Sequence, residues 1–322
     1  MYEILPWHKN VWKCINKNRK TSQILLIIGL QGIGKFNLAK NFAHSLLCDN
    51  LLKDNIPCGR CHACLLFNKN NHPDFLLVQS DNSHIITIEQ IRIVIKEIFY
   101  TTHQGRVKII IIKDADLLNI SAANLLLKIL EEPPSQTMII LTTSNIDFLF
   151  STIRSRCKIL TIPIPEYSIC ENWLRQKITD INHVKLLLSI TNNAPLLALN
   201  LFNNNWLYER QTLLSNLYNF LYKKMTLGDV IIHFLNLDIK DFLQFFYYII
   251  HDLIKIKLTV NYITNSDHIN QLYFYAKKAN LKKLLILQEQ MCYLNYNYIQ
   301  HINFNKQMLM ENILLNFINM LE

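Results

Sequence analysis

Short apolar runs recur in the first half of the chain, and each is the length of a strand. The runs are "QILLII" at 23–28, "VKIIIIKDAD" at 107–116, "MIILTTS" at 138–144 and "CKILTIPIP" at 157–165. Continuous apolar runs of this length are typical of strands that are buried on both faces of a parallel sheet. The first run therefore predicts a buried parallel strand, and each of the other three predicts a further strand.

Helical spacing of apolar residues follows the first two runs. Residues 36–48 carry it at Leu38, Phe42 and Leu46, with the small Ser45 at the same spacing. After the second run, Ser121 is a candidate N-cap, and the apolar positions Leu125, Leu126 and Ile129 precede a stop at Pro133–Pro134. This alternation predicts a doubly wound α/β domain that ends near Pro165.

Beyond Pro165 the apolar residues recur only at helical spacing. Two segments, "DFLQFFYYIIHDLIKIKL" at 241–258 and "MLMENILLNFINML" at 308–321, are apolar nearly all round, as helices buried in a bundle or an interface are. We predict a small helical domain at 166–206 and a larger helical domain at 207–322.

Composition places the chain among globular proteins with more than one core. Of its 322 residues 50% are hydrophobic and 18% are charged, which suits two or three domains. No apolar run reaches the roughly 18 residues of a membrane span, and the first ten residues do not read as a signal peptide. We expect a soluble, cytoplasmic protein with no membrane contact. The net charge of +9 leaves contact with DNA open, because a bias toward Ile, Asn and Lys would produce the same charge.

Four of the eight cysteines lie close together in "CDNLLKDNIPCGRCHAC", at Cys48, Cys58, Cys61 and Cys64. Two overlapping C-x-x-C steps direct three thiolates at one ion, and the loop after Cys48 returns the fourth, which makes the tetrahedral set that Zn²⁺ prefers. Gly59 suits the tight turn between ligands. A disulfide framework or a redox pair explains the spacing less well. Since the protein fills all four positions, we expect structural rather than catalytic zinc.

The remaining cysteines and two nearby histidines are given structural interpretations. We expect Cys14, Cys157, Cys170 and Cys292 to be small core residues rather than nucleophiles. His62 and His72 are expected at the surface.

The stretch "IIGLQGIGKF" at 27–36 has the order of a phosphate-binding P-loop except at its last residue. Backbone amides and Lys35 could meet phosphate oxygens, but Phe36 stands where a Ser or Thr hydroxyl would ligate Mg²⁺. The candidate nucleotide-binding residues are Gly29, Gly32, Gly34 and Lys35. The structural alternative is that these glycines only let a strand turn into a helix.

These motifs, together with "HPDF" at 72–75, "AANLLLKILEEPP" at 122–134 and "TIRSRC" at 152–157, give the chain a family resemblance. The chain resembles the delta-prime subunits of bacterial DNA polymerase III, which are AAA+ subunits of the clamp loader. The resemblance is densest over 1–165 and fainter through "NNAPLLALNLF" at 192–202. It implies an AAA+ α/β domain at 1–165 with a zinc module at about 48–75, a helical lid at 166–206 and a helical collar at 207–322.

The resemblance also implies a role and partners. The chain would complete a five-subunit ring with the delta and tau or gamma subunits. That ring loads the sliding clamp onto primed DNA as part of the DNA-directed DNA polymerase holoenzyme, a nucleotidyltransferase. We expect no catalysis by this subunit itself.

Three departures from an active ATPase support that expectation. Phe36 replaces the metal hydroxyl, and alignment with related ATPases puts Lys113 at the metal carboxylate, with Asp114 at the acidic position after it. Leu196 falls at or near the arginine that senses the γ-phosphate. Hydrolysis is therefore not expected, and whether the loop still holds ATP or ADP stays open.

The "SRC" segment at 155–157 carries the one catalytic candidate, Arg156. Spacing alone favours a local salt bridge. The resemblance instead implies an arginine finger that reaches the γ-phosphate in a neighbouring subunit. Two other functions remain as alternatives, an independent P-loop ATPase or nucleotide kinase and a zinc-containing DNA-binding protein of another kind.

Overall fold

The computed structural model describes residues 4–17, 19, 23–81, 85–100, 107–222, 224–260, 262–299 and 304–321. The chain divides into two compact units, Met1–Gln176 with Asn193–Leu197, and Lys177–Asn192 with Ala198–Glu322. The expected domain limits at 165 and 206 stay a prediction. Among the described residues, no helix is both long enough and apolar enough to cross a bilayer.

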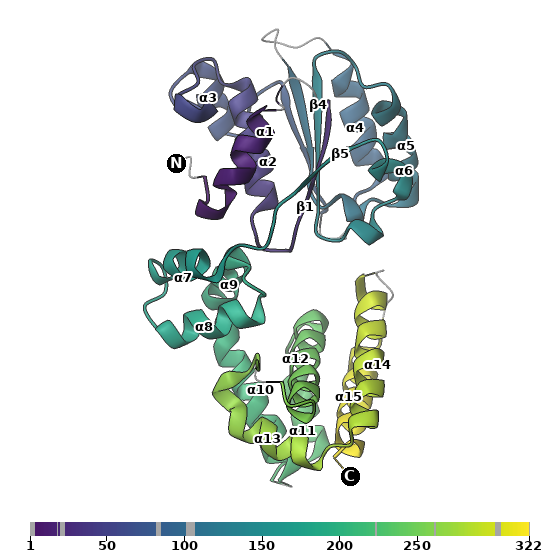
Figure 1. Ribbon diagram of the computed structural model, residues 1–322. Helices are drawn as coiled ribbons and strands as arrows, with labels where there is room; N and C mark the ends of the chain where they lie inside the picture. Colours follow the sequence, from purple (N-terminus) through teal and green to yellow (C-terminus); the bar gives the residue numbers. More distant parts are fainter. Residues whose placement is uncertain are drawn as a thin grey trace. The chain divides into compact units, whose positions relative to one another are not determined.

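The first unit contains a five-stranded parallel sheet in the order β2-β3-β4-β1-β5 (Figure 1). The strands are β1 (Ile24–Ile28), β2 (Phe75–Val78), β3 (Lys108–Ile112), β4 (Thr137–Thr143) and β5 (Lys158–Thr161). β1 lies between β4 and β5, with Ile24 opposite Ile139 of β4 and Leu25 opposite Lys158 of β5. The four strands predicted from apolar runs are confirmed, and so is the parallel α/β fold.

Successive residues of each central strand enter different cores on the two faces of the sheet. In β1, Leu26 packs with α4 (Ile88–Ile98), α5 (Ile120–Glu131) and α6 (Ser151–Arg154). Its neighbour Ile27 packs on the other face with α1 (Lys9–Lys17), α2 (Lys35–Leu47) and α3 (His62–Asn68). Figure 1 shows these two groups of helices on opposite sides of the sheet. Burial on both faces explains why these strands are apolar throughout.

Strand β2 and helix α4 were not predicted from the sequence. β2 is a four-residue edge strand, and most of its side chains are only partly buried, so the apolar signal is short. Helix α4 has a readable start, because the Thr87 backbone N–H donates to Gln90 Oε1 at 3.0 Å in a capping box. The "TIEQ" pattern could have located this helix.

The expected N-cap of α5 is wrong by two residues. Asn119 is the N-cap, and its Oδ1 accepts from the Ala122 backbone N–H at 2.8 Å. Ser121 lies inside the first turn and is exposed. Asn and Ser are about equally good caps, so the earlier of the two begins the helix. The predicted stop before Pro133 is confirmed, since α5 ends at Glu131.

The second unit is helical, as predicted. Two helices lie near the boundary between the units in the sequence. Helix α7 (Tyr167–Arg175) belongs to the first unit, and α9 (Pro195–Asn203) begins in the first unit and continues into the second. The others are α8 (Ile181–Ile190), α10 (Trp206–Leu221), α11 (Leu227–Phe234), α12 (Ile239–Lys257), α13 (Ile269–Lys278), α14 (Leu281–Ile299) and α15 (Lys306–Asn319).

The two helices expected to be buried all round differ from each other. α12 contributes the buried rings of Phe242, Phe245 and Phe246 to the core of the second unit. In α15, one face is buried, but Met308 is 70% exposed and Leu315 is 47% exposed. The expectation is therefore wrong for α15.

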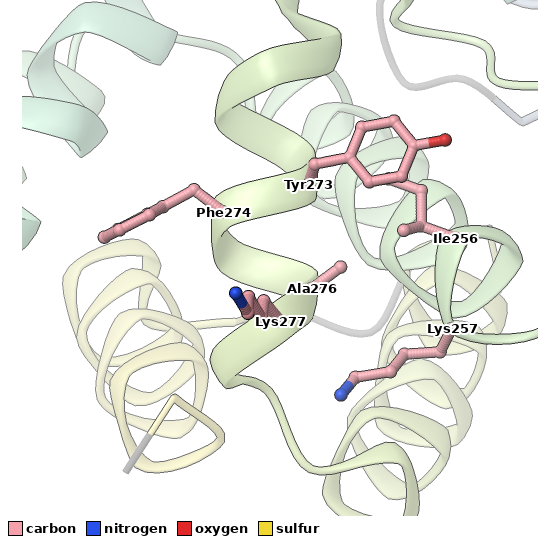
Figure 2. A pocket seen from close by; sticks show the side chains of 6 residues that line it. All are labelled: Ile256, Lys257, Tyr273, Phe274, Ala276 and Lys277. Carbon is pink, nitrogen blue, oxygen red and sulfur yellow. The ribbon is translucent and has the colours of Figure 1, made fainter.

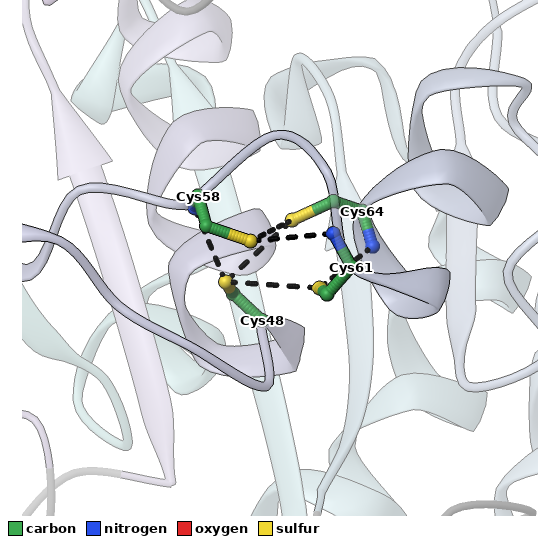
Figure 3. Close-up of side chains that lie close together, drawn as sticks. All are labelled: Cys48, Cys58, Cys61 and Cys64. Carbon is green, nitrogen blue, oxygen red and sulfur yellow. Dashed lines mark hydrogen bonds between the residues drawn. The ribbon is translucent and has the colours of Figure 1, made fainter.

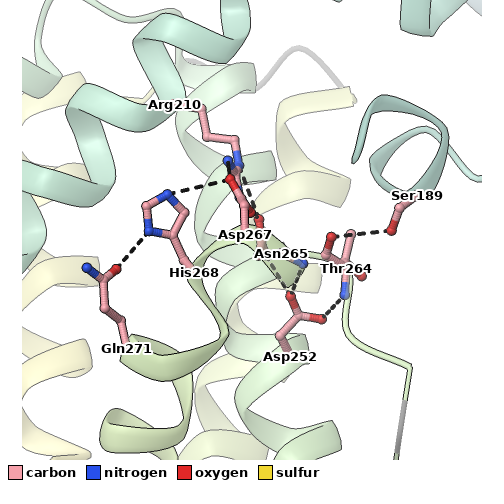
Figure 4. Close-up of polar contacts among 8 residues, drawn as sticks. All are labelled: Ser189, Arg210, Asp252, Thr264, Asn265, Asp267, His268 and Gln271. Atoms are coloured by element: carbon pink, nitrogen blue, oxygen red, sulfur yellow. Dashed lines mark hydrogen bonds and ion pairs between the residues drawn. The ribbon is translucent and has the colours of Figure 1, made fainter. Parts of the chain in front are cut away.

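A buried polar network fixes the loop between α12 and α13 (Figure 4). Asp252 is fully buried, and its carboxylate accepts hydrogen bonds from the backbone N–H groups of Thr264 and Asn265 at 2.9 and 2.8 Å. Arg210, which is 2% exposed, donates to both carboxylate oxygens of Asp267 at 2.6 and 2.7 Å. The buried donors and acceptors of this loop thus satisfy one another.

Replacing Asp252 by Ala should lower the free energy of unfolding by about 3–5 kcal/mol, because two buried backbone N–H groups would lose a charged acceptor. Urea unfolding followed by circular dichroism measures the change. Asp241→Ala is the matched control, since Asp241 lies in the first turn of the same helix and its loss should cost less than about 1 kcal/mol. Equal losses for both variants would show that the network is energetically unimportant.

Candidate functional site

The four clustered cysteines converge as their spacing predicts (Figure 3). Cys48 follows α2, Cys61 is the N-cap of α3 and Cys64 lies in the first turn of α3. The four Sγ atoms all lie within 4.8 Å of one another. Cys48 Sγ is 3.5 Å from Cys64 Sγ and 4.0 Å from Cys61 Sγ. A tetrahedral ion with bonds of about 2.3 Å would place its sulfurs about 3.8 Å apart, so the cluster can hold a metal ion.

Backbone amides favour thiolates at this cluster. The N–H groups of Cys58 and Cys61 donate to the sulfurs of Cys48 and Cys58, each at 3.3 Å. The pKa of Cys58 is lowered to about 6, chiefly because the Arg60 backbone N–H donates to its sulfur. Burial raises the pKa values of Cys48 and Cys64. Metal ligation requires the thiolate form, so a bound cation would have to offset this burial.

Gly59 makes the turn between ligands. Its φ of +74° lies in the left-handed region, and a Cβ there would meet no atom within 4 Å. The constraint is therefore backbone conformation alone, as the sequence predicted.

The expected exposure of three other residues, His72, Cys14 and Cys292, is wrong. His72 is 3% exposed rather than at the surface, and its Nδ1 accepts from the Asp74 backbone N–H at 3.1 Å. Cys14 and Cys292 are exposed rather than in the core, because each lies on the outer side of its helix beside a buried neighbour, Ile15 or Met291. The expectation holds for Cys170, which is buried, and partly for Cys157.

The P-loop-like segment has the strand, turn and helix that the sequence predicted. Gly32 and Gly34 have φ values of +82° and +88°, which residues other than glycine rarely adopt. The backbone turns here from β1 into α2, whose first residue is Lys35.

Lys35 is held by its own chain. It is 6% exposed, and its Nζ donates to the Gly29 and Leu30 carbonyls at 2.9 Å each and to Ser144 Oγ at 2.8 Å. Burial lowers the pKa of Lys35 to about 8, while Asp114 and Asp116 act in the opposite direction. All three donors of the ammonium are therefore occupied within the protein.

Leucine side chains occupy the room beside the loop's glycines. A Cβ on Gly32 would lie 2.3 Å from Leu197 Cβ, and one on Gly34 would lie 2.8 Å from Leu5 Cδ1 and 3.1 Å from Leu196 Cδ1. The Leu196 backbone N–H also donates to the Gly32 carbonyl at 3.0 Å. Beyond the placement of Leu196 at or near the sensing position, nothing in the sequence indicated these contacts.

The N-terminal segment holds the same loop through one carbonyl. The Ile33 carbonyl accepts from Trp7 Nε1 at 2.9 Å and from His8 Nε2 at 2.8 Å. Burial lowers the pKa of His8 to about 4, so a neutral imidazole makes this donation near pH 7. The loop is thus tied to segments that precede and follow the sheet.

Phe36 and Lys113 lie close to each other, at the two positions where the sequence predicts that Mg²⁺ ligands are lost. Lys113 Nζ lies 5.5 Å from the centroid of the Phe36 ring, within the range of a cation–π interaction. Nearby, Asp116 accepts from Thr143 Oγ1 at 2.8 Å, and burial raises its pKa. The backbone N–H of Asp114 donates to Thr142 Oγ1 at 3.1 Å. A lysine and a phenyl ring thus pair between the end of β3 and the start of α2.

Arg156 follows α6 and makes a local ion pair. Its Nη2 lies 2.6 Å from Glu131 Oε1, and its Nη1 donates to the Thr152 carbonyl at 2.8 Å. The side chains of Arg156 and Glu131 are 34% and 53% exposed. The salt bridge that spacing alone favoured is present, and at this exposure such a pair contributes about 0–1 kcal/mol.

Comparison with known proteins fits this geometry. A family model described as "DNA polymerase III, delta subunit" matches residues 6–166, and one described as "DNA polymerase III, delta subunit, C terminal" matches residues 204–319. The DNA polymerase III subunit delta' of Buchnera aphidicola subsp. Acyrthosiphon pisum is 31% identical over 85% of each chain. That of Yersinia pestis is 28% identical over 97% of this chain and 94% of its own.

Other matches are partial or distant. The alignment with the Pseudomonas aeruginosa delta' subunit, at 31% identity, spans 62% of this chain and 61% of that protein, less than two thirds of its length. A solved DNA polymerase III gamma subunit-related protein of Thermotoga maritima aligns with a TM-score of 0.46 at 18% identity, over 97% of this chain and 99% of that one.

The parallel sheet, the P-loop-like turn and the four-cysteine cluster define an α/β protein with the strand, turn and helix of a P-loop fold. The two family models and the relatives carry the assignment further. The chain belongs to the delta-prime family of DNA polymerase III subunits.

Proposed function

We propose that the chain is the non-hydrolysing delta-prime subunit of a clamp loader. In this role it completes a ring with delta and tau or gamma subunits, which loads the sliding clamp onto primed DNA in the cytoplasm. Family membership supports the proposal. The observation that carries the non-hydrolysing part is the contact between Phe36 and Lys113, because together they replace both protein anchors of Mg²⁺.

The same site argues against nucleotide binding. The ammonium of Lys35 already donates to three acceptors of its own chain, and leucines lie against Gly32 and Gly34. A phosphate would have to displace both sets of contacts, and no metal ion would be present to offset the interactions that are lost. We infer that Gly29, Gly32, Gly34 and Lys35 maintain the turn and do not serve ATP or ADP.

The proposal also assigns the metal and the domains. Zn²⁺ at Cys48, Cys58, Cys61 and Cys64 would be structural, because protein ligands fill all four positions. The proposed division is an AAA+ domain at 1–165, a lid at 166–206 and a collar at 207–322, the collar holding the ring together. Arg156 would act on a neighbouring subunit's nucleotide.

The purified chain should show no magnesium-dependent ATP turnover and no ATP binding by calorimetry. Phe36→Thr should create neither, because Lys113 would still repel the ion and Lys35 would stay engaged. The alternative, an independent P-loop ATPase or nucleotide kinase, predicts turnover by the chain alone. Turnover at the rate of an ordinary AAA+ enzyme, after contamination is excluded, would decide for that alternative.

Ring membership is tested separately by co-purification. The tagged chain should recover delta and tau or gamma subunits from cell extract in a complex of fixed stoichiometry. Recovery of the chain alone, with its metal site and both units folded, would contradict the proposed role.

A further inference from the structure

The second unit has an open pocket between the end of α12 and one side of α13. Ile256, Lys257, Tyr273, Phe274, Ala276 and Lys277 line about 450 Å³ of space. Figure 2 shows the Tyr273 ring and the Lys257 side chain on either side of the small Ala276 side chain, while Phe274 projects from the opposite side of α13. These six residues are called the α12–α13 pocket below.

Positive charge is concentrated around this pocket beyond the bias of the whole chain. The chain has 33 basic and 24 acidic residues. Between residues 254 and 283 there are six lysines and one acidic residue, Asp267, and that residue is ion-paired with Arg210. A general enrichment in lysine does not explain the loss of acidic residues from this segment. The charge therefore suits an anionic partner.

Exposed aromatic rings accompany the lysines. Tyr273 is 54% exposed and Phe274 is 40% exposed. Lys278 Nζ lies 4.6 Å from the Phe274 ring centroid, and the Tyr222 ring stacks on the same Phe274 ring, with the centroids 5.9 Å apart and an interplanar angle of 20°. Exposed ring faces beside ammonium groups match the two parts of a nucleotide, a flat base and a charged phosphate.

We propose that the α12–α13 pocket binds single-stranded nucleic acid. A base stacks on Tyr273, and neighbouring phosphates contact Lys257 and Lys277. An acidic peptide is a poorer fit, because the described walls of the pocket are sides of helices and offer no strand edge for backbone pairing. The inference goes beyond the proposed function, since membership of a ring needs no nucleic-acid contact from this unit.

The test uses the full chain and a fluorescein-labelled oligo-dT of about 15 nucleotides, with binding followed by fluorescence anisotropy. Two phosphate contacts on a single strand should weaken binding about sevenfold between 50 and 200 mM salt. Tyr273→Ala should weaken binding at least about fivefold, which is the lower limit for loss of one stacked base. Tyr273→Phe should bind as the unaltered chain does, because it keeps the ring.

Charge is tested on one helix with a matched pair. Lys257→Gln removes a cation from the last turn of α12, and Lys240→Gln removes one from its first turn. Lys257→Gln should weaken binding and reduce the salt dependence, whereas Lys240→Gln should change neither. Circular dichroism should confirm that every variant keeps its helix content.

Four results would overturn the proposal. They are no binding at 50 mM salt, equal effects of Lys240→Gln and Lys257→Gln, no effect of Tyr273→Ala, and displacement of oligo-dT by a Glu- and Leu-rich peptide at lower concentration than by unlabelled oligo-dT. The last result would assign the pocket to an acidic protein partner. None of them would affect recovery of delta and tau or gamma subunits, so failure here is distinguishable from failure of the proposed function.

Discussion

Replacement of Cys64 by Ala should abolish metal binding and unfold the segment from about 48 to 75. Cys64 is fully buried, and its sulfur is 3.5 Å from that of Cys48, so no other group can take its place. Structural zinc sites of this kind contribute about 10–16 kcal/mol of apparent binding free energy at pH 7. That energy is comparable to the 5–15 kcal/mol that stabilises a typical protein.

The effect should stay local to the insert. The core that joins β1, β3 and β4 to α4 and α5 contains no residue of this segment, whereas the core on the other face of the sheet contains Phe67 and Phe75 from it. The sheet should therefore remain folded through its contacts with α4 and α5. Elemental analysis should find about one zinc per chain before the substitution and none after it. Hydrogen exchange should show loss of protection in α3 while the central strands stay protected.

Cys292→Ala provides the control, because Cys292 is an exposed thiol outside the cluster. It should leave both zinc content and exchange unchanged. Retention of one tightly bound zinc by Cys64→Ala, or absence of metal from the unaltered chain with α3 fully protected, would contradict a four-thiolate structural site.

The fold was readable from the sequence where local pattern and burial agree. β1, β3 and β4 are buried on both faces, so their apolar runs are continuous. β2 lies at an edge and is short, and for that reason its pattern is weak. The N-cap of α5 was misplaced because Asn119 and Ser121 are both capable caps, and only the observed backbone decides between them.

The metal cluster was predictable for a different reason. Its four cysteines are close together in sequence, so short turns alone bring the sulfurs of Cys58, Cys61 and Cys64 close enough to hold one ion. The state of the P-loop was not predictable in this way. The contacts of Gly32 with Leu197 and of Phe36 with Lys113 join segments far apart in the chain. Such contacts depend on how parallel strands align, which a single sequence does not specify.

Arg156 shows the same limit. Spacing gave a local salt bridge as the simpler interpretation, but it did not identify the partner as Glu131 at the end of α5. That pair does not exclude a second role. Because both side chains are partly exposed, breaking the pair costs only about 0–1 kcal/mol, far less than an arginine finger contributes to a phosphoryl transfer step.

Arg156→Ala should therefore leave the subunit folded, with its metal, and able to join the ring, yet slow ATP hydrolysis at one neighbouring site. Removal of an arginine finger typically reduces the rate by about 10³ to 10⁵, which corresponds to roughly 4–7 kcal/mol of barrier. Arg156→Lys should restore little, because an ammonium keeps the charge but loses the planar fork. Clamp loading onto primed DNA is the better measurement, since the other ATP sites would continue to hydrolyse.

Two matched variants separate a finger from a structural residue. Arg154 is exposed and lies in α6, two positions before Arg156, so Arg154→Ala removes a cation from the same segment and should load clamps normally. Glu131→Gln breaks the local ion pair while it keeps the arginine, and loading should persist if Arg156 acts in trans. Loss of loading in Glu131→Gln equal to that in Arg156→Ala would instead show that the ion pair itself is what matters. Normal loading by Arg156→Ala, with assembly confirmed, would show that Arg156 is only a surface salt-bridge partner.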